Sequence, residues 1–304
     1  MQSIEQSDAN PKVSVLLAVH NGAEFIGEAI ESILAQHYTS WELIIVDNGS
    51  TDKTAEVCSR YVQIDSRIRF ESIPEKNKNK AYNRGYQIAS GAYLCFFGAD
   101  DLLPPNSLSE RVSILRGCGA DAFSTCCLQT VSEDAKYDGL VFPRNKMRPN
   151  YSGGSVLFSK SLASQIFPLP VDQPNEDTWT LLHLRAFGVN RHVPKALYRY
   201  RIHKGNSYGY GMAFGEKRSQ YLRRMRAYEL FHEKFRQSGL AFLESDVVPF
   251  LNGLRAATRG SIPGIMFVKG LRIQNKLVLA YYCSPTMYRI RNFYFRTLSG
   301  GVAW

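Results

Sequence analysis

The sequence predicts an α/β fold, with a mostly parallel sheet flanked by helices and a helical extension at the C-terminal end. Three observations support this prediction. Short apolar runs alternate with amphipathic segments over the first two hundred residues, a rhythm typical of βαβ units. Polar residues directly follow several apolar runs, which is where ligands bind in parallel sheets. The last ninety residues carry the whole net positive charge of the chain.

The apolar runs predict strands and the amphipathic segments predict helices. From Phe25 onward, for example, apolar residues recur three to four apart, which marks one face of a helix. Continuous apolar strands of this kind are typically buried on both faces of a sheet. The expected strands are 13–19, 43–46, 68–71, 92–97, 123–131, 156–158 and 196–202. The expected helices are 25–34, 54–61, 81–89 and one beginning at Glu176, with loops at 143–150 and 168–174.

Charge divides the chain in two. Residues 1–214 hold 22 Lys and Arg against 22 Asp and Glu, whereas residues 215–304 hold 15 against 5. Such a shift indicates that the two parts meet different partners. We therefore predict a disordered tail over residues 1–10, an α/β domain over 11–214 and a basic helical extension over 215–304.

The composition indicates a cytoplasmic protein that is soluble or peripherally bound to a membrane. Its hydrophobic content of 44% is enough for a full core. The six cysteines form no Cys-x-x-Cys pair and no zinc spacing, so we expect reduced thiols. Residues 1–10 lack the features of a secretion signal. No apolar stretch reaches the roughly 18 to 20 residues that span a bilayer.

Polar clusters follow three of the predicted strands. His20 and Asn21 follow the first, Asp47 ends the second, and Asp100 and Asp101 follow the strand at 92–97. Because parallel strands end at the same edge of a sheet, we expect these clusters to converge.

Asp100 and Asp101 have two interpretations. Two adjacent carboxylates suit Mg²⁺ or Mn²⁺, which prefer oxygen ligands and often bridge to a phosphate. They also suit a capped turn, because Pro104 and Pro105 follow. The other polar clusters favour the metal.

The remaining polar residues also allow two roles. Asp47 suits binding of a base or ribose, or capping of the next helix, and for Asp52 we favour the cap. Glu176 and Asp177 open a helix, where acids favour the helix dipole, but one of them suits a general base. His203 ends a cation-rich strand and is either structural or a metal or diphosphate contact.

The motifs in this order resemble those of the family 2 inverting glycosyltransferases, which have the GT-A fold of the nucleotide-diphosphosugar transferases. The resemblance covers about residues 12 to 208. It rests on the segments 13–21, 32–36, 41–52, 81–85 and 90–93, and on Asn77, Asp100, Asp101, Glu176, Asp177 and His203.

The resemblance implies a role for each matching residue. Asp177 would be the catalytic base, Asp47 would bind the base of the nucleotide, and Asp100, Asp101 and His203 would hold Mn²⁺ or Mg²⁺. An acceptor hydroxyl would attack the anomeric carbon opposite the diphosphate and invert the configuration. The nucleotide-sugar site would comprise Ala18, His20, Asn21, Asp47, Asn77, Lys80, Asn83, Ala99, Asp100 and Glu176.

Two departures from the family pattern concern this site. Gly98 replaces the first Asp of the Asp-x-Asp element, so Asp101 or a water would take over its contact. The segment 18–21 differs from the usual Pro-x-Tyr-Asn-like element, which affects the base pocket. The Gln-x-x-Arg-Trp motif and transmembrane helices of processive members are absent from the sequence, which favours transfer of a single sugar.

The resemblance thus implies a hexosyltransferase-type enzyme that uses a nucleotide-diphosphosugar, in particular a UDP-sugar. Its acceptor would be a saccharide or lipid-linked hydroxyl in bacterial surface polysaccharide synthesis. Two alternatives are a sugar-phosphate nucleotidyltransferase and a non-catalytic sugar-nucleotide-binding subunit. A nucleotidyltransferase would need a Gly-rich, Lys- or Arg-bearing loop after the first strand, and residues 19–24 do not supply one. Gly98 suggests the non-catalytic subunit.

The basic, aromatic-rich segment 261–304 suits either of two environments. It would bind an anionic membrane surface, or it would form a helical cap on the core with solvated Lys and Arg. No nucleic-acid motif accompanies its charge, so we expect no nucleic-acid partner.

Overall fold

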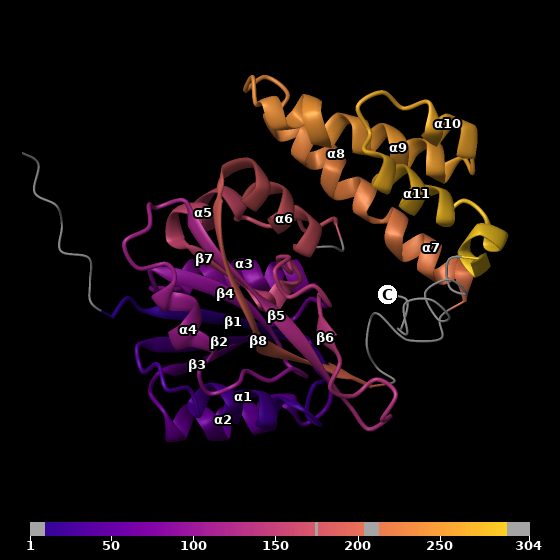
Figure 1. Ribbon diagram of the computed structural model, residues 1–304. Helices are drawn as coiled ribbons and strands as arrows, with labels where there is room; N and C mark the ends of the chain where they lie inside the picture. Colours follow the sequence, from indigo (N-terminus) through magenta and orange to yellow (C-terminus); the bar gives the residue numbers. More distant parts are fainter. Residues whose placement is uncertain (1–9, 174–175, 204–212, 291–304) are drawn as a thin grey trace, which may run out of the picture. The chain divides into compact units, whose positions relative to one another are not determined.

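The computed structural model describes residues 10–173, 176–203 and 213–290 (Figure 1). The described residues within Met1–Val171 and His183–His203 form one compact unit, and those within Asp172–Leu182 and Lys204–Trp304 form a second. The predicted disordered tail lies outside the described residues except for Asn10. In the part of the chain that is described, no helix is long and apolar enough to cross a bilayer.

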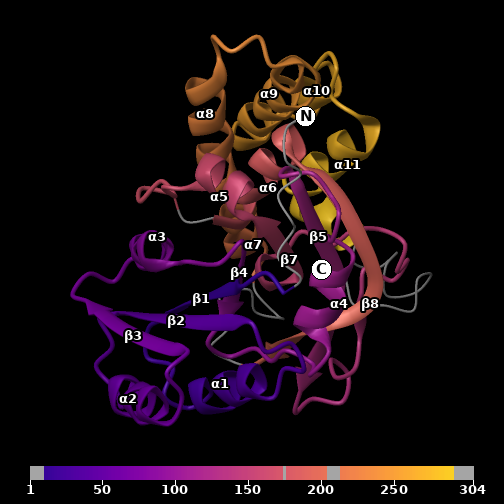
Figure 2. The same ribbon diagram turned by 90° about the vertical axis from the view of Figure 1, so that its left-hand side faces the viewer.

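An eight-stranded sheet forms the centre of the first unit (Figure 2). Four neighbouring strands are parallel, as predicted, whereas β7 runs antiparallel to both β4 and β5. The spatial order is β3 (Ile68–Ile73), β2 (Trp41–Asn48), β1 (Val13–Val19), β4 (Tyr93–Gly98), β7 (Val156–Ser159), β5 (Ala122–Ser132) and β6 (Val141–Phe142). The last strand, β8 (Val189–Ile202), pairs in parallel with β5.

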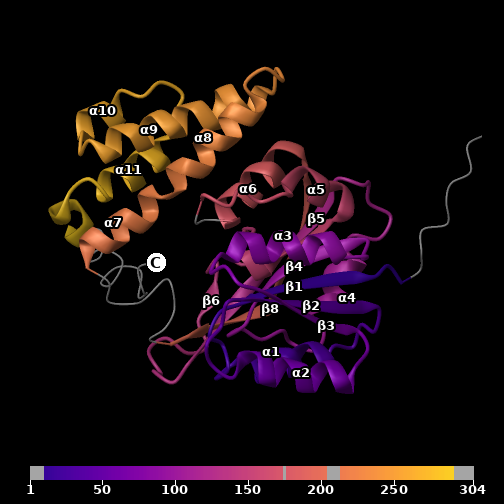
Figure 3. The same ribbon diagram turned by 180° about the vertical axis from the view of Figure 1, so that it is seen from behind.

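Helices cover both faces of the parallel part of the sheet, so its strands are buried on both sides. α1 (Ile26–Leu34) and α2 (Thr54–Ile64) lie on one face, and α3 (Lys78–Ile88) lies on the other (Figure 3). Leu16, Ile44 and Val46 point towards Gly85 of α3. The residues of β1 and β2 that point to the opposite face, such as Val15 and Ile45, belong to the same core cluster as Ile26 of α1.

The sequence did not predict the helices α4 and α5 or the two-residue strand β6, and it placed the start of β8 too late. α4 (Ser107–Ser113) and α5 (Lys160–Ile166) have only 7 residues each, too few for a clear helical period. The strand β8 begins at Val189 rather than at residue 196, because its first residues are mostly exposed and form no apolar run.

The second unit is helical, as the sequence predicts for the chain beyond residue 215. Trp179, in the first part of α6 (Glu176–Phe187), packs with its ring centroid 6.3 Å from that of Phe231. The rings of Tyr228 and Phe250 lie 4.8 Å apart. Its other elements are α7 (Phe214–Leu222), α8 (Arg224–Phe235), η2 (Leu243–Val247), α9 (Val248–Thr258), α10 (Ile262–Met266) and α11 (Ile273–Tyr281).

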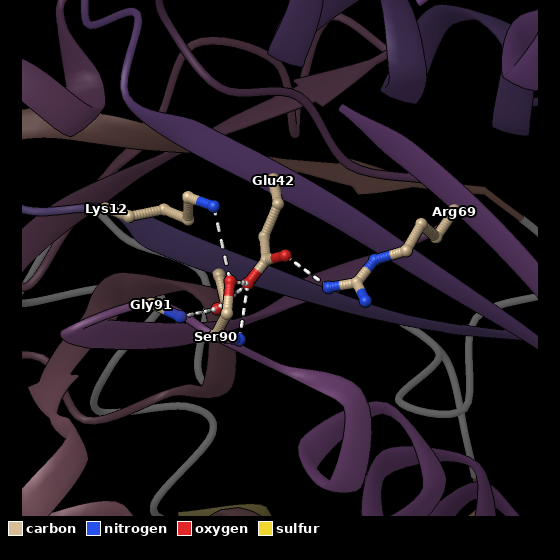
Figure 4. A network of polar contacts seen from close by, with 6 residues as sticks. Lys12, Glu42, Arg69, Ser90 and Gly91 are labelled. Carbon is tan, nitrogen blue, oxygen red and sulfur yellow. Dashed lines mark hydrogen bonds and ion pairs between the residues drawn. The ribbon is translucent and has the colours of Figure 1, made fainter. Parts of the chain in front are cut away.

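A buried carboxylate joins the beginnings of four strands (Figure 4). Glu42 of β2 is 5% exposed, and its Oε1 accepts hydrogen bonds from Ser14 Oγ of β1 and from the backbone N–H and hydroxyl of Ser90. Its Oε2 pairs with Arg69 of β3. The N–H of Gly91, just before β4, donates to Ser14 Oγ at 2.9 Å.

These contacts set the charge state of Glu42. Burial alone would raise the pKa of Glu42, but the hydrogen bonds from Ser14 and Ser90 and the charge of Arg69 outweigh it and leave the pKa below its ordinary value. Beside this network lies a cavity of about 270 Å³ lined by Lys12, Thr39, Ser40, Trp41, Glu42, Ser66, Arg67 and Arg69. It lies at the amino ends of the strands, away from the predicted site.

We predict that Glu42→Ala lowers the free energy of unfolding by about 2–3 kcal/mol, because it leaves buried donors unsatisfied. A carboxyl whose folded pKa is lowered contributes stability above its unfolded pKa, and this contribution is lost as the pH falls through the folded value. The loss caused by the substitution should therefore shrink below about pH 4. Urea unfolding across pH 3–7 measures both effects. The control is Glu56→Ala, which removes the exposed pair with Arg60 and should cost less than about 0.5 kcal/mol; equal losses would contradict the prediction.

Candidate active site

The loop that follows β1 is fastened to the loop that follows β2. Asn21 has a φ of 52°, and its Oδ1 accepts the N–H of Thr51 at 2.8 Å. The N–H of Asn21 donates to Ser50 Oγ at 2.8 Å, and His20 Nδ1 lies 3.1 Å from the carbonyl oxygen of Asn48. The predicted convergence of the polar residues after these two strands is therefore present.

Asp52 adds two hydrogen bonds to this connection between the loops. Its Oδ1 accepts the N–H of Thr54, the first residue of α2, at 3.0 Å, and its Oδ2 accepts the N–H of Ala23 at 3.1 Å. Asp52 thus holds the start of α2, in line with the capping role favoured from the sequence.

Asp47 lies at the carboxyl end of β2, in register with Val19 of β1. Its side chain is buried, with 3% of the residue exposed. Asp47 Oδ1 accepts the N–H of Ser50 at 2.9 Å, which turns the chain away from the strand. In the described residues Oδ2 accepts no hydrogen bond, so this oxygen can accept a donor from a ligand.

Three polar side chains of α3 and its cap have partners within the protein. Asn77 caps α3 by accepting the N–H of Lys80 and donates to the carbonyl oxygen of Val171, both at 3.0 Å. The Asn83 amide bonds both backbone groups of Leu169, and Lys80 Nζ pairs with Glu75 at 3.0 Å. These contacts fix the segment 169–171, and a role of Asn77, Lys80 and Asn83 in donor binding stays a prediction.

The two carboxylates after β4 differ in their surroundings. Asp101 is 5% exposed, and its Oδ2 accepts a hydrogen bond from the Tyr198 hydroxyl while its Oδ1 accepts the N–H of Arg201 at 2.9 Å. Burial and the charge of Asp100 raise the pKa of Asp101 to about 7, against the effect of these two hydrogen bonds. Because both oxygens have donors from β8, Asp101 primarily anchors β8 to β4.

Asp100 is more open and faces His203. Its side chain is 33% exposed, and its Oδ2 lies 3.1 Å from His203 Nε2. The ring of Phe25 packs 4.6 Å from that of His203, and Arg201 donates to the Asp100 carbonyl oxygen at 2.9 Å. Arg201 also pairs with Glu28 of α1 at 2.7 Å. The end of β8 is therefore held between β4 and α1, which brings His203 to Asp100.

Gly98 leaves the space that the Asp101 carboxylate fills. A Cβ at position 98 would overlap Asp101 Oδ2 and lie 2.9 Å from Asp100 Oδ1. The Asp101 carboxylate thus occupies the place that the first carbon of a side chain at position 98 would enter. Ala18, in register with Gly98, and the half-buried Ala99 complete this edge.

Sequence reasoning did not assign Tyr198 or Arg201 to the site. The cation-rich run before His203 was a signal for Arg201, but Tyr198 alternates onto the other face of the strand and had no such signal. Their acceptor, Asp101, is about a hundred residues away in the sequence, so the pairing of β8 was needed to find it.

Glu176 and Asp177 belong to the second compact unit. Both lie in the first turn of α6, where Glu176 is buried and Asp177 is exposed. The expectation that Asp177 shares one site with Asp47 and Asp100 stays a prediction.

The donor set at the end of β4 suits a hard divalent cation. Asp100 supplies carboxylate oxygens and His203 a ring nitrogen, both from the first unit. No three His, Cys, Asp or Glu side chains come together as a complete metal cage among the residues described. Mg²⁺ sites typically use one or two carboxylates and are completed by substrate phosphate and water, and Asp100 supplies one such carboxylate.

Comparison with known proteins identifies the family. Residues 14–161 match the family described as Glycosyl transferase family 2, a stretch that contains β2 to β4, β1 apart from Val13, and Asp47, Asp100 and Asp101. This match confirms, over residues 14–161, the family resemblance seen in the sequence. TuaG of Bacillus subtilis, assigned by its name to teichuronic acid biosynthesis, is 32% identical over 127 residues, covering 41% of this chain and 49% of that protein. The chain spans about half or less of the length of the curated relatives it matches.

Solved structures share the fold. S. aureus TarS 1-349 in complex with UDP-GlcNAc has a TM-score of 0.59 at 15% identity, covering 96% of this chain and 93% of that chain. Mannosyltransferase PcManGT from Pyrobaculum calidifontis, in complex with GDP-Man and Mn²⁺, has a TM-score of 0.59 at 18% identity, with 94% and 88% covered. The predicted GT-A fold is confirmed.

We predict that Gly98→Ala costs about 1–3 kcal/mol in unfolding free energy, because the new methyl group must displace the Asp101 carboxylate. In an Asp101→Ala background the same substitution should cost at least about 0.5 kcal/mol less, as expected for two groups that compete for one space. Chemical denaturation of the four proteins measures this coupling. Gly119→Ala is the control, because a Cβ there meets no atom within 4 Å. Strictly additive losses at positions 98 and 101 would disprove the shared space.

Proposed function

We propose that this protein transfers a single sugar from a nucleotide-diphosphosugar, specifically a UDP-sugar, to a hydroxyl of a saccharide or lipid-linked acceptor, with inversion at the anomeric carbon. The observation that carries the proposal is the pairing of Asp100 with His203 at the end of β4, at the same sheet edge as Asp47 within a family 2 domain. TarS has been solved with UDP-GlcNAc, which supports a UDP-linked donor. PcManGT has been solved with GDP-Man and Mn²⁺, which supports the use of a metal.

Donor binding would use the edge formed by β1, β2 and β4. Asp47 Oδ2 would accept a hydrogen bond from the base, and the fastened loops after β1 and β2 would shape the pocket around it. Ala18, His20, Asn21 and Ala99 would line this pocket. Such preorganised loops reduce the ordering cost of binding.

Asp100, Asp101 and His203 would hold Mn²⁺ or Mg²⁺, and Asp101 would also keep β8, and therefore His203, in place. A divalent cation there would neutralise the charge that develops on the departing nucleoside diphosphate. The protein's own contribution would be to orient the diphosphate for reaction.

Asp177 would act as the general base. Its carboxylate would take the proton of the acceptor hydroxyl as that oxygen attacks the anomeric carbon from the face opposite the diphosphate. The bond from the anomeric carbon to the diphosphate oxygen breaks as the new glycosidic bond forms, so no covalent enzyme intermediate is needed. Glu176 would contact the sugar of the donor.

The biological setting proposed is bacterial surface polysaccharide synthesis at the cytoplasmic face of the plasma membrane. The similarity to TuaG supports this setting.

A thermal-shift screen of nucleotide sugars with and without Mn²⁺ tests the binding step. A ligand at about 100 times its Kd adds roughly 2.7 kcal/mol to stability, so a UDP-sugar should raise Tm by several degrees, and more so with Mn²⁺. Asp100→Asn should abolish the Mn²⁺-dependent part of the shift while retaining a shift from UDP alone. A protein that gives no shift with any nucleotide sugar would refute the proposal.

Substitution of Asp177 tests the catalytic step. Asp177→Asn should lower kcat about 10²- to 10⁴-fold, because the general base is lost, and should change donor affinity little. The control is Asp121→Asn, which removes an exposed carboxylate of the first unit and should keep full activity. Equal turnover by wild type and Asp177→Asn would remove Asp177 from the mechanism.

A further inference from the structure

The chain beyond Asp246 is uniformly basic. It contains no Asp or Glu, whereas its cations are Arg255, Arg259, Lys269, Arg272, Lys276, Arg289, Arg291 and Arg296. Of the segment 261–304 that the sequence links to a membrane, residues 291–304 lie outside the described residues.

Large apolar side chains are exposed around the turn between α10 and α11. Phe267 is 84% exposed, Ile273 60%, and Met266 and Leu277 41% each. Single exposed apolar residues are common on soluble proteins, but a group of four within twelve residues is a sign of an interaction surface.

These four side chains belong to one surface. Ile273 and Leu277 are one turn apart on α11 and therefore share a face. Lys276, in the same turn, donates from Nζ to the carbonyl oxygen of Met266 at 2.6 Å, which brings α11 next to Met266 and Phe267. We call the surface of Met266, Phe267, Ile273 and Leu277 the apolar patch.

The apolar patch stands on a packed base. Ile265, immediately before it, is fully buried, and so is Leu279, while Leu271 is 7% exposed. The N–H of Phe267 donates to the Pro263 carbonyl oxygen at 3.1 Å. The exposed side chains are therefore held outward by neighbours that form the core of the helical unit.

Cations border the apolar patch. Lys269 and Arg272 are exposed in the turn itself, and Lys276 is half-buried beside Met266. Arg272 lies 3.3 Å from Asp246, but its side chain remains 68% exposed. An exposed aromatic and aliphatic surface bordered by Lys and Arg matches the interface of an anionic bilayer, where apolar groups enter the acyl boundary and cations meet lipid phosphates.

We propose that the apolar patch, with Lys269, Arg272 and Lys276, binds the surface of an anionic lipid bilayer. A second copy of the chain fits this surface less well, because a twofold interface would bring the same three cations of each copy together, and Asp246 beside Arg272 offsets only part of this charge. This inference goes beyond the proposed function and does not depend on it, since no residue of the sugar-nucleotide site takes part.

Vesicle flotation tests the proposal with the full chain. Wild type should float with vesicles that contain phosphatidylglycerol and should remain unbound with pure phosphatidylcholine vesicles. The double variant Phe267→Ser/Ile273→Ser should partition at least about tenfold more weakly, given the transfer energies of the two side chains. Lys269→Gln should weaken binding by about fivefold at low salt. The matched control, Ile64→Ser/Val189→Ser, removes apolar side chains that are 70% and 50% exposed in the first unit and should float like wild type.

Three results would overturn the proposal. They are equal binding of wild type to neutral and anionic vesicles, equal losses in the patch variant and the control variant, and self-association without lipid that the patch variant abolishes. An unchanged Tm of the patch variant shows that it is folded. Its nucleotide-sugar thermal shift should equal that of wild type, so failure of membrane binding and failure of donor binding are separate results.

Discussion

The in-register parallel pairing of β1 with β2 and β4 is the constraint on which the candidate site depends. Val19 pairs with Asp47, and Ala18 pairs with Gly98. The loops after all three strands therefore leave the sheet at the same edge. The hydrogen bonds of Asn21, Ser50 and Asp52 then fasten the first two loops together. At the amino ends of the strands, the Glu42 side chain links the beginnings of β1, β2 and β4 by its hydrogen bonds with Ser14 and Ser90.

A second constraint brings in a strand that is distant in sequence. Asp101 receives hydrogen bonds from Tyr198 and Arg201, and this places His203 beside Asp100. Of the two adjacent acids, Asp101 is held by two donors of β8, whereas Asp100 faces His203. Their burial differs as well: Asp101 is 5% exposed, whereas a third of the Asp100 side chain is accessible.

The parallel core and the residues at its carboxyl edge could be predicted from the sequence, because β1, β2 and β4 are continuous apolar runs that end in polar residues. Local patterns could not predict that both oxygens of Asp101 are occupied, since their donors come from β8. They also could not predict that Asn83 bonds the backbone of Leu169. The short helices α4 and α5 and the exposed start of β8 lack a strong period, and tertiary packing decides their conformation.

The space shared by positions 98 and 101 has a consequence for protein engineering. Installing an aspartate at position 98 would place its Cβ where the carboxylate of Asp101 already lies, so that carboxylate would have to move. A mutant library that varies both positions would include clones with a shorter residue 101, which leave room for the new acid. They would also need another acceptor for the Tyr198 hydroxyl.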